Sequence, residues 1–330
     1  MSPAAHLPIV DVSGFRTPGE RGVDEAALVR QLDNACREIG FFGVVGHGVD
    51  PTLLGELDTA ARDFFALPDE VKSAISMRHA GRAWRGWFPL YGEVTSGRPD
   101  GKEGLYFGTD HPADHPRILD GTLLHGANLY PQDPPALRAA VIAWLDALRP
   151  VADTVMAAIA LALGLDARWF ERHLTADPTI LFRVFHYPPT AATNTEWGVA
   201  EHTDYGLLTL LAQDGEGGLE VRNRDGRWLE VEPTPDVLVC NIGDMLERLT
   251  RGRYRSTPHR VRNTSDRARL SFPYFFDPSW DATVPTLPLI DEEGGEESER
   301  RWDRADPIAW EGTYGDYLSA KVARVFGDLI

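Results

Sequence analysis

Two histidines and an aspartate have the types and the spacing to hold a metal ion. His202 and Asp204 are two residues apart in the stretch H-T-D-Y-G, and His259 follows later in the chain. On an extended segment, residues two apart point to the same side, so His202 and Asp204 can converge on one ion. Two imidazoles and one carboxylate occupy one face of a divalent metal and leave the opposite positions open, which is the ligand set of non-haem Fe(II) oxygenases. A surface turn with an unrelated histidine is the alternative interpretation.

Arg269 and Ser271 form a second polar pair, again two residues apart on an expected strand. A guanidinium group binds a carboxylate through two parallel hydrogen bonds, and a neighbouring hydroxyl adds a third. A dianionic co-substrate can therefore be held here by its far end while its other end chelates the metal. The alternative is an ordinary salt bridge of Arg269. However, the strand continues as S-F-P-Y-F-F, and a buried apolar strand is an unusual place for an unpaired charge.

The other histidines with suggestive neighbours and the two cysteines have structural interpretations. His47 lies between two glycines after an apolar run, and we expect a hydrogen-bonded structural histidine rather than a ligand. His111 and His115 lie among Asp and Pro residues, which indicates a surface turn rather than a second metal site. Cys36 and Cys240 lie in apolar runs without a C-x-x-C partner, which favours buried thiols over a disulfide.

The composition favours a globular protein and excludes some classes of partner. The chain has 330 residues, of which 43% are hydrophobic, so it can bury a sizeable core in one large domain or two. Its 33 basic and 50 acidic residues give a formal net charge of −17, which repels phosphate and argues against nucleic acid or an anionic membrane as the main partner. The start, M-S-P-A-A-H-L-P-I-V-D-V, has no basic region followed by a long apolar core, and no stretch of about 18 apolar residues occurs in the sequence. We expect a soluble cytoplasmic protein.

The first part of the chain is expected to mix helices, one strand and loops. Residues 24–39 repeat apolar side chains on one helical face, and Gly40 stands where a helix C-cap belongs. Residues 41–45 form a compact apolar run that predicts a buried strand, and 53–65 predict a second amphipathic helix. The stretch 80–131 is rich in Gly, Pro and aromatic residues without a regular period, so we expect ordered loops that pack through aromatic contacts.

The later part of the chain is expected to be mainly β. A long helix begins at Pro134-Pro135 and runs to Leu165, kinked or divided at Pro150. Short runs of β-branched and aromatic residues separated by turn pairs then predict strands at 180–187, 198–202, 207–213, 219–222, 228–231, 237–241, 259–261 and 269–276. Many short strands with regular turns indicate a sandwich or barrel. The acidic stretch 291–299 predicts a surface loop, and 314–326 a closing helix.

Taken together, these motifs resemble the isopenicillin N synthase-like family of Fe(II)/2-oxoglutarate-dependent dioxygenases. In the later part the resemblance is carried by H-T-D-Y-G-L-L-T-L-L from His202, N-I-G-D-M-L from Asn241, G-R-Y-R-S-T-P-H-R-V ending at Val261, and R-L-S at Arg269. Earlier matches are P-I-V-D-V-S from Pro8, G-F-F-G-V-V-G-H-G-V from Gly40, R-G-W-F-P-L from Arg85 and K-E-G-L-Y-F-G ending at Gly108. The similarity extends over nearly the whole chain.

The resemblance implies an α+β protein with a mainly β core, a double-stranded β-helix (jelly roll) with flanking helices. It implies an N-terminal helical or mixed region, 1–175, packed on a jelly-roll core, 176–330, that ends in a helix. By residue-to-residue match, His202, Asp204 and His259 bind Fe(II), whereas Arg269 and Ser271 bind the C5 carboxylate of 2-oxoglutarate, assisted by Tyr187. One departure is Phe185, where many relatives have asparagine, and contact with that end of the co-substrate is expected to be weaker or rearranged.

The implied activity is the oxidation of an unactivated C–H bond of a small molecule with O2, releasing succinate and CO2. Hydroxylation is the first expectation, with desaturation or cyclisation as variants. The candidate walls of the substrate site are Arg85, Trp87, Tyr106, Phe107, Arg183, Phe185 and Phe276. Two alternatives remain open: an iron oxidase of the same family that does not use 2-oxoglutarate, and a non-catalytic metal-binding jelly-roll module. No sequence feature indicates an oligomeric state.

Overall fold

Two β-sheets face each other in this protein, and helices cover the outer side of the larger one. The computed structural model describes residues 4–5, 7–16, 25–192, 197–263, 265–287 and 306–325. The larger sheet has eight strands in the order β2-β3-β13-β10-β15-β8-β7-β4. The smaller has five in the order β1-β12-β11-β14-β9. This mixed arrangement is a double-stranded β-helix with flanking helices, as the sequence predicts.

The strands of the larger sheet come from both parts of the chain. Their bounds are Ile9–Asp11 (β2), Phe41–Val45 (β3), Gly86–Phe88 (β4), Glu103–Gly108 (β7), Pro178–Tyr187 (β8), Leu208–Gln213 (β10), Leu238–Ile242 (β13) and Arg269–Ser279 (β15). Apart from the parallel pair β2 and β3, neighbouring strands in this sheet are antiparallel. The register of β15 with β8 pairs Arg269 with Tyr187 and Ser271 with Phe185. The predicted co-substrate residues therefore lie side by side.

The smaller sheet is formed almost entirely by the later part of the chain. Its strands are Ala4–Ala5 (β1), Val199–His202 (β9), Leu219–Arg222 (β11), Trp228–Val231 (β12) and His259–Val261 (β14). β14 pairs antiparallel with β9, with His259 directly opposite His202. This pairing brings together two histidines that are distant in the sequence. A separate hairpin consists of Val94–Thr95 (β5) and Arg98–Pro99 (β6).

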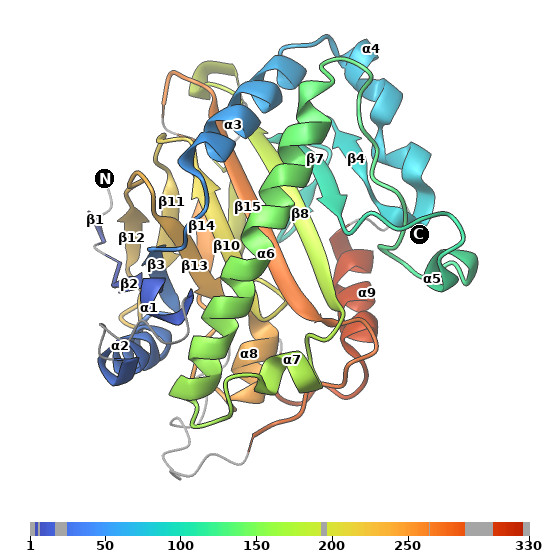
Figure 1. Cartoon of the computed structure of the whole chain (residues 1–330). Coiled ribbons are helices and arrows are strands. Elements are labelled where there is room, and N and C mark those ends of the chain that lie inside the picture. The colour runs from blue at the N-terminus through green and yellow to red at the C-terminus, as the bar shows by residue number, and fades with distance from the viewer. Residues whose placement is uncertain are drawn as a thin grey trace.

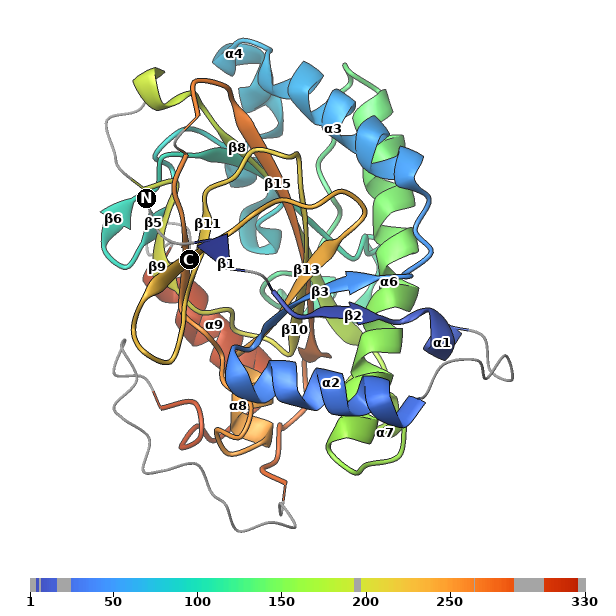
Figure 2. The ribbon, with the colours of Figure 1, turned by 90° about the vertical axis from the view of Figure 1, so that its left-hand side faces the viewer.

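A long helix crosses the outer face of the larger sheet. This helix, α6 (Ala136–Ala162), packs against α3 (Pro51–Phe65) and α2 (Glu25–Glu38), as Figures 1 and 2 show. Its buried side includes Trp144, Leu148 and Val151, which belong to the main hydrophobic core. Pro150 lies inside α6 without dividing it. The helix α9 (Tyr314–Val325) lies against β15, near the lower end of that strand in Figure 1.

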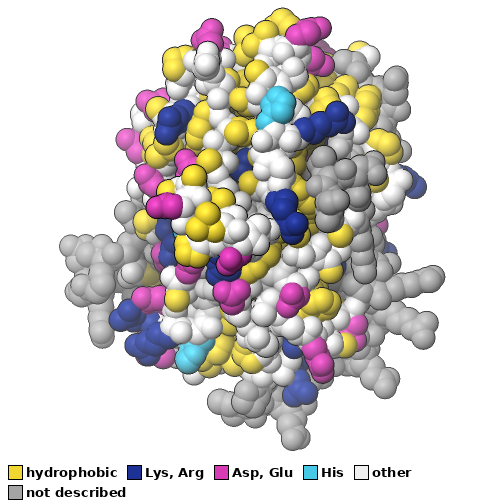
Figure 3. Space-filling view, turned by 90° about the vertical axis from the view of Figure 1, so that its right-hand side faces the viewer, with side chains coloured by type: hydrophobic (Ala, Val, Ile, Leu, Met, Phe, Trp, Pro, Cys, Tyr) yellow, Lys and Arg dark blue, Asp and Glu magenta, His cyan; other side chains and the backbone are white. Residues whose placement is uncertain are grey.

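The remaining elements are short. They are the α-helices Ser13–Arg16 (α1), Asp69–Lys72 (α4), Pro116–Leu119 (α5), Trp169–His173 (α7) and Asp244–Leu249 (α8), and the 3-10 helices Ser73–Ile75 (η1), Met77–Ala83 (η2) and Thr190–Ala192 (η3). The face that carries α5 and β4 shows acidic, basic and apolar side chains interspersed (Figure 3). Within the described part of the chain, the helices lack the length and apolar character needed to cross a membrane.

The expectation that 80–131 contains only loops was wrong, because β4 and β7 belong to the larger sheet. All six residues of β7 are buried, so the strand lacks the alternation of polar and apolar residues that marks a half-exposed strand. The structural interpretation of His47 is consistent with its contacts, since Nε2 lies 3.2 Å from the Asp236 carbonyl and Nδ1 accepts a hydrogen bond from the Val49 amide. The acidic loop predicted at 291–299 lies outside the described residues.

Candidate active site

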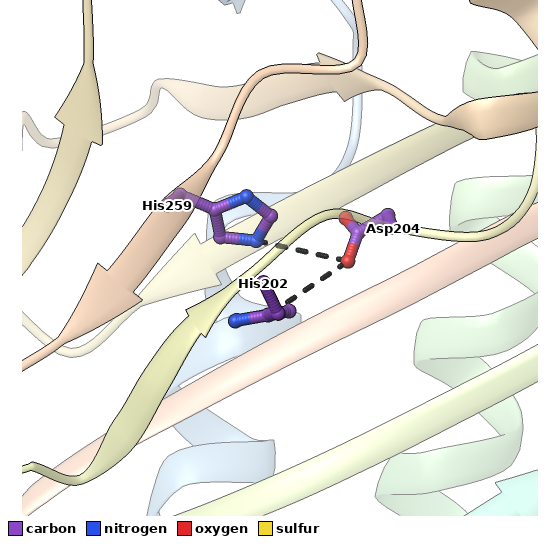
Figure 4. Close-up of side chains that lie close together, drawn as sticks. All are labelled: His202, Asp204 and His259. Carbon is purple, nitrogen blue, oxygen red and sulfur yellow. Dashed lines mark ion pairs between the residues drawn. The ribbon is translucent and has the colours of Figure 1, made fainter. Parts of the chain in front are cut away.

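His202, Asp204 and His259 converge at the inner side of the smaller sheet. His202 ends β9, Asp204 follows in the loop, and His259 begins β14 (Figure 4). Oδ1 of Asp204 lies 3.9 Å from Nε2 of His202 and 3.7 Å from Nε2 of His259. The three potential ligand atoms lie within 4.8 Å of one another. This geometry suits a single ion with the three groups on one side.

Each imidazole is oriented by a backbone carbonyl. Nδ1 of His202 lies 2.8 Å from the oxygen of Ala200, and Nδ1 of His259 lies 3.1 Å from the oxygen of Thr257. A carbonyl only accepts, so both Nδ1 atoms carry the proton and both Nε2 lone pairs face the centre. Burial, and then the proximity of His259, lowers the pKa of His202 to about 4. His202 is therefore neutral at physiological pH, as a metal ligand must be.

Asp204 is held by one of its two oxygens. Oδ2 accepts hydrogen bonds of 2.6 Å from the hydroxyl of Thr209 and 2.6 Å from the amide of Asn241. Burial by itself raises the pKa of Asp204, but the two imidazoles and these two donors outweigh it and hold the pKa below its ordinary value. Asp204 is thus an oriented carboxylate with Oδ1 directed at the histidines. The donor set fits a divalent iron ion in charge and in type.

Arg269 is a buried cation with unused donors. Its side chain is fully buried, and Nη2 donates a 3.1 Å hydrogen bond to Gln213. Among the residues that the structure describes, Nε and Nη1 have no hydrogen-bond partner. The guanidinium lies over the ring of Tyr187, 4.7 Å from its centroid, and the Tyr187 hydroxyl is 3.4 Å from that of Ser271. Leaving such donors unpaired in the interior is costly, so the site fits a carboxylate, as on 2-oxoglutarate.

A single cavity of about 450 Å³ contains the three converging side chains together with Arg269, Ser271 and Tyr187. It lies between the two sheets and is bordered on one side by the β5–β6 hairpin and on another by α9. Of the seven predicted substrate residues, Tyr106, Arg183 and Phe185 line it. A metal ion, a co-substrate and a small second substrate can therefore meet in one space.

The other four predicted substrate residues are not among those lining the cavity. Trp87 donates a hydrogen bond to Glu103, whereas Phe107 stacks in the core between Tyr130 and Phe182. Phe276 is fully buried in the main core, and Arg85 is buried behind Phe107. The reason is the alternation of side chains along a strand. Phe107 and Phe276 are each next in sequence to a residue that lines the cavity. Their side chains therefore point to the opposite face of the strand.

A buried ionic cluster stands beside Phe185. The ammonium of Lys102 lies 2.6 Å from Glu93 and 2.5 Å from Asp100, and 4.8 Å above the Phe185 ring. Burial opposes the charge on Lys102, but the two carboxylates hold its pKa above the ordinary value. Tyr106 donates a short hydrogen bond to Glu93. At Phe185, this chain therefore has an aromatic ring covered by a paired lysine.

Several residues of the site were not predicted from the sequence. Thr209 and Asn241 orient Asp204, and Glu93 and Lys102 line the cavity. Their side-chain types are common, and their positions become meaningful only when the register of the strands is known. The motif N-I-G-D-M-L contained Asn241, but nothing in the sequence assigned it to the carboxylate.

Comparison with known proteins agrees with this geometry. Residues 7–133 match the N-terminal model of non-haem dioxygenases in morphine synthesis, and residues 178–278 match the 2OG-Fe(II) oxygenase superfamily. A probable iron/ascorbate oxidoreductase of Dictyostelium discoideum is 40% identical, with 98% of this chain and 95% of that protein covered. A homoarginine-6-hydroxylase of Glycine max is 36% identical, with 98% of each covered. A 1-aminocyclopropane-1-carboxylate oxidase of Dictyostelium mucoroides is 32% identical, covering 98% of this chain and 96% of that protein.

Solved structures show the same fold with the co-substrate bound. A full-length Neurospora crassa protein, solved in complex with alpha-KG and 5-formyluracil, superimposes with a TM-score of 0.76 at 25% identity, covering 96% of each chain. Together with the His-Asp-His site, these matches establish Fe(II), 2-oxoglutarate and O2 as the cofactor and co-substrates. The chain belongs to the 2OG-Fe(II) oxygenase superfamily and is an Fe(II)- and 2-oxoglutarate-dependent dioxygenase.

Proposed function

We propose that this dioxygenase hydroxylates an unactivated C–H bond of an α-amino acid. The proposal assigns iron binding to His202, Asp204 and His259, and binding of the far carboxylate of 2-oxoglutarate to Arg269, Ser271 and Tyr187. The observation that carries these assignments is the pair of unpartnered donors on buried Arg269, in the same cavity as the three converging ligands. Bound iron supplies the oxidative chemistry with O2, and the protein supplies orientation and exclusion of water.

The side chains of this site have orienting roles. The carbonyls of Ala200 and Thr257 hold the two imidazoles in the tautomer that presents Nε2. Thr209 and Asn241 keep Oδ2 of Asp204 occupied, which leaves Oδ1 for the metal. None of these groups has to gain or lose a proton during turnover, because bound iron would supply the oxidative chemistry. The apolar parts of the cavity wall keep bulk water from the reacting bond.

The proposed substrate class rests on the relatives. Homoarginine and 1-aminocyclopropane-1-carboxylate, named for two of the similar proteins, are both α-amino acids. Both carry a carboxylate and an amino group on one carbon, and both are small enough for a cavity of about 450 Å³ beside a co-substrate. Hydroxylation is the reaction named for the homoarginine enzyme, which aligns with 98% of this chain at 36% identity.

The test is to supply the iron-loaded enzyme with 2-oxoglutarate, O2 and single amino acids. The panel contains homoarginine, arginine, lysine and 1-aminocyclopropane-1-carboxylate. We expect one of them to stimulate succinate formation and to gain one oxygen atom. When 18O2 replaces ordinary O2, the mass of that product should increase because the incorporated atom is 18O. The variant His202→Ala is the control and should form neither product. Absence of stimulation and of oxygen incorporation with all four amino acids would contradict the proposed class.

A further inference from the structure

Arg183 places a second buried guanidinium group in the cavity, besides that of Arg269. Its side chain projects from β8, is only 8% exposed, and lies among the lining residues. The guanidinium is stacked on the ring of Tyr106, 3.5 Å from its centroid. Nη1 donates hydrogen bonds to the carbonyls of Phe107 and Phe182, at 3.2 Å and 3.1 Å. These contacts fix the plane of the group without neutralising its charge.

Within the described part of the chain, Arg183 forms no ion pair, whereas other buried cations do. Lys102 pairs with Glu93 and Asp100, and Lys72 pairs with Glu103. Glu93 and Asp277 attract Arg183 through space. The carboxylate of Glu93 is already engaged by Lys102 and by the hydroxyl of Tyr106, and Asp277 accepts a hydrogen bond from Tyr314. A charged group in the interior is expected to have a partner. The partner of Arg183 is therefore expected to arrive with a ligand.

A second guanidinium strengthens the positive potential at this wall. Arg85 lies behind Arg183, and both donate to the carbonyl of Phe107. Burial, and then repulsion from Arg183, lowers the pKa of Arg85. Arg85 itself is turned away from the cavity and donates to the carbonyl of Leu124. An anion in front of Arg183 would offset the repulsion between the two guanidinium groups.

The anion site at Arg183 is distinct from that at Arg269. Tyr187 marks the Arg269 end of β8, because these two residues are directly opposite in the register of β8 and β15. Arg183 lies four positions earlier on the same face of β8, about 13 Å along the strand at the usual rise. The five-carbon skeleton of 2-oxoglutarate, held at Arg269 and at the metal, does not extend to both positions. Arg183 is left for the other substrate.

We propose that Arg183 binds a carboxylate of the primary substrate and so selects acids over neutral compounds of the same shape. The proposal rests on the proposed function, because it requires that the cavity takes an oxidisable substrate beside 2-oxoglutarate. Tyr106 orients the guanidinium, and Arg85 adds positive charge from behind. For an α-amino acid, this contact anchors the head group and leaves the side chain to reach the metal.

The first test uses the unmodified enzyme with matched acids and amides. The protein, loaded with Fe(II) and 2-oxoglutarate without oxygen, is titrated with arginine and argininamide, propionate and propionamide, and benzoate and benzamide, while the visible charge-transfer band is followed. We expect at least one acid to perturb the band, with an affinity about tenfold or more above that of its amide, since a charge-assisted pair is lost in the amide. Equal affinities of acids and amides, or no response to any acid, would overturn the proposal.

Variants then test whether Arg183 is the source of the preference for acids over amides. Arg183→Gln should abolish the preference for acids while keeping the band formed with 2-oxoglutarate, and Arg183→Lys should retain part of it. Arg260→Gln is the control, because it removes an arginine that is paired with Glu220 and does not line the cavity. This control should keep the acid preference. An unchanged preference in Arg183→Gln would refute the assignment. Absence of any band with 2-oxoglutarate in the unmodified protein would instead count against the function itself.

Discussion

Asp204 is a proposed metal ligand whose direction depends on two neighbours. Thr209 and Asn241 both donate to Oδ2, so the carboxylate cannot rotate freely and Oδ1 stays aimed at the histidines. Residues that orient a ligand in this way commonly affect metal affinity almost as much as the ligand itself. The proposed iron site therefore depends on residues of β10 and β13 as well as on the three proposed ligands.

Replacement of Asn241 by alanine tests this dependence. We expect Asn241→Ala to weaken Fe(II) binding by about 10- to 100-fold, because Asp204 loses a donor and gains freedom to rotate. Anaerobic titration of the metal-free protein with Fe(II) measures the change. The control is Asn223→Ala in the turn between β11 and β12, which should leave the affinity unchanged. Equal affinities for both variants would show that Asn241 does not orient Asp204.

Asp277 gives the protein a pH-dependent stability. It is buried, and its Oδ2 accepts a 2.5 Å hydrogen bond from the hydroxyl of Tyr314. Burial raises the pKa of Asp277 from 3.8 to about 7. The unfolded chain releases this proton at lower pH than the folded chain does. The contribution of Asp277 to the free energy of unfolding is therefore fully present below pH 3.8 and is lost as the pH rises towards 7.

Asp277→Asn should remove this loss, because asparagine carries no charge and still accepts a bond from Tyr314. We expect the metal-free variant to exceed the natural protein in free energy of unfolding by about 1–4 kcal/mol at pH 8. The difference should shrink progressively between pH 7 and pH 4. Urea unfolding at a series of pH values measures it. A difference that is independent of pH, or that grows in acid, would contradict the assignment.

The loop that carries Asp204 is packed too closely to accept a larger residue. A Cβ atom added at Gly206 would lie 1.5 Å from Oδ1 of Asp277, and one added at Gly243 would lie 2.4 Å from the carbonyl oxygen of Gly206. The link between β9 and β10 is thus held between β15 and the start of α8. This packing fixes the position of Asp204 relative to β9 and β14.

Gly206→Ala should therefore disturb the metal site from outside it. We expect a loss of about 1–3 kcal/mol in the free energy of unfolding from overpacking, together with weaker Fe(II) binding. The matched control is Gly55→Ala in α3, where an added Cβ has no atom within 4 Å. Because alanine favours helix, that variant should be neutral or more stable by up to about 1 kcal/mol. Similar behaviour of both variants in thermal unfolding would argue against the close packing.

The sequence predicted elements well where side-chain patterns are strong. The strand at 41–45 and those at 219–222, 228–231 and 259–261 have the predicted bounds, since each is a short run next to clear turn residues. The strand β7 was missed because both of its faces are buried, and α8 because it is only six residues long. Only three of the seven candidate substrate residues line the cavity, for a related reason. The face on which a strand residue lies depends on the register, which the local sequence does not determine.

Both parts of the chain contribute to one sheet. The strands β2, β3, β4 and β7 precede residue 175, yet they flank the later strands in the larger sheet. The helix α6 covers the outer face formed by β10 and β15. The boundary between an N-terminal region, 1–175, and a core region, 176–330, stays a prediction. The larger sheet and the main hydrophobic core extend across it.

We expect the protein to unfold in a single transition. Circular dichroism and tryptophan fluorescence should give coincident unfolding curves in urea. The reason is that the strands before residue 175 and the later strands are both needed to complete the larger sheet. A fragment comprising 176–330 should not fold, because it would expose the edge of β13 that pairs with β3 and the edge of β8 that pairs with β7. A cooperative transition of that fragment alone would show two independent domains.

The most direct measurement is an anaerobic titration of the metal-free protein with Fe(II) and then with 2-oxoglutarate, followed through the visible charge-transfer band. We expect the band in the natural protein, none in His202→Ala, and a much higher requirement for 2-oxoglutarate in Arg269→Ala. Arg260→Ala, which removes an arginine paired with Glu220 outside the cavity, should behave like the natural protein. Bound iron without a band, or equal 2-oxoglutarate requirements in the two arginine variants, would contradict the assigned site.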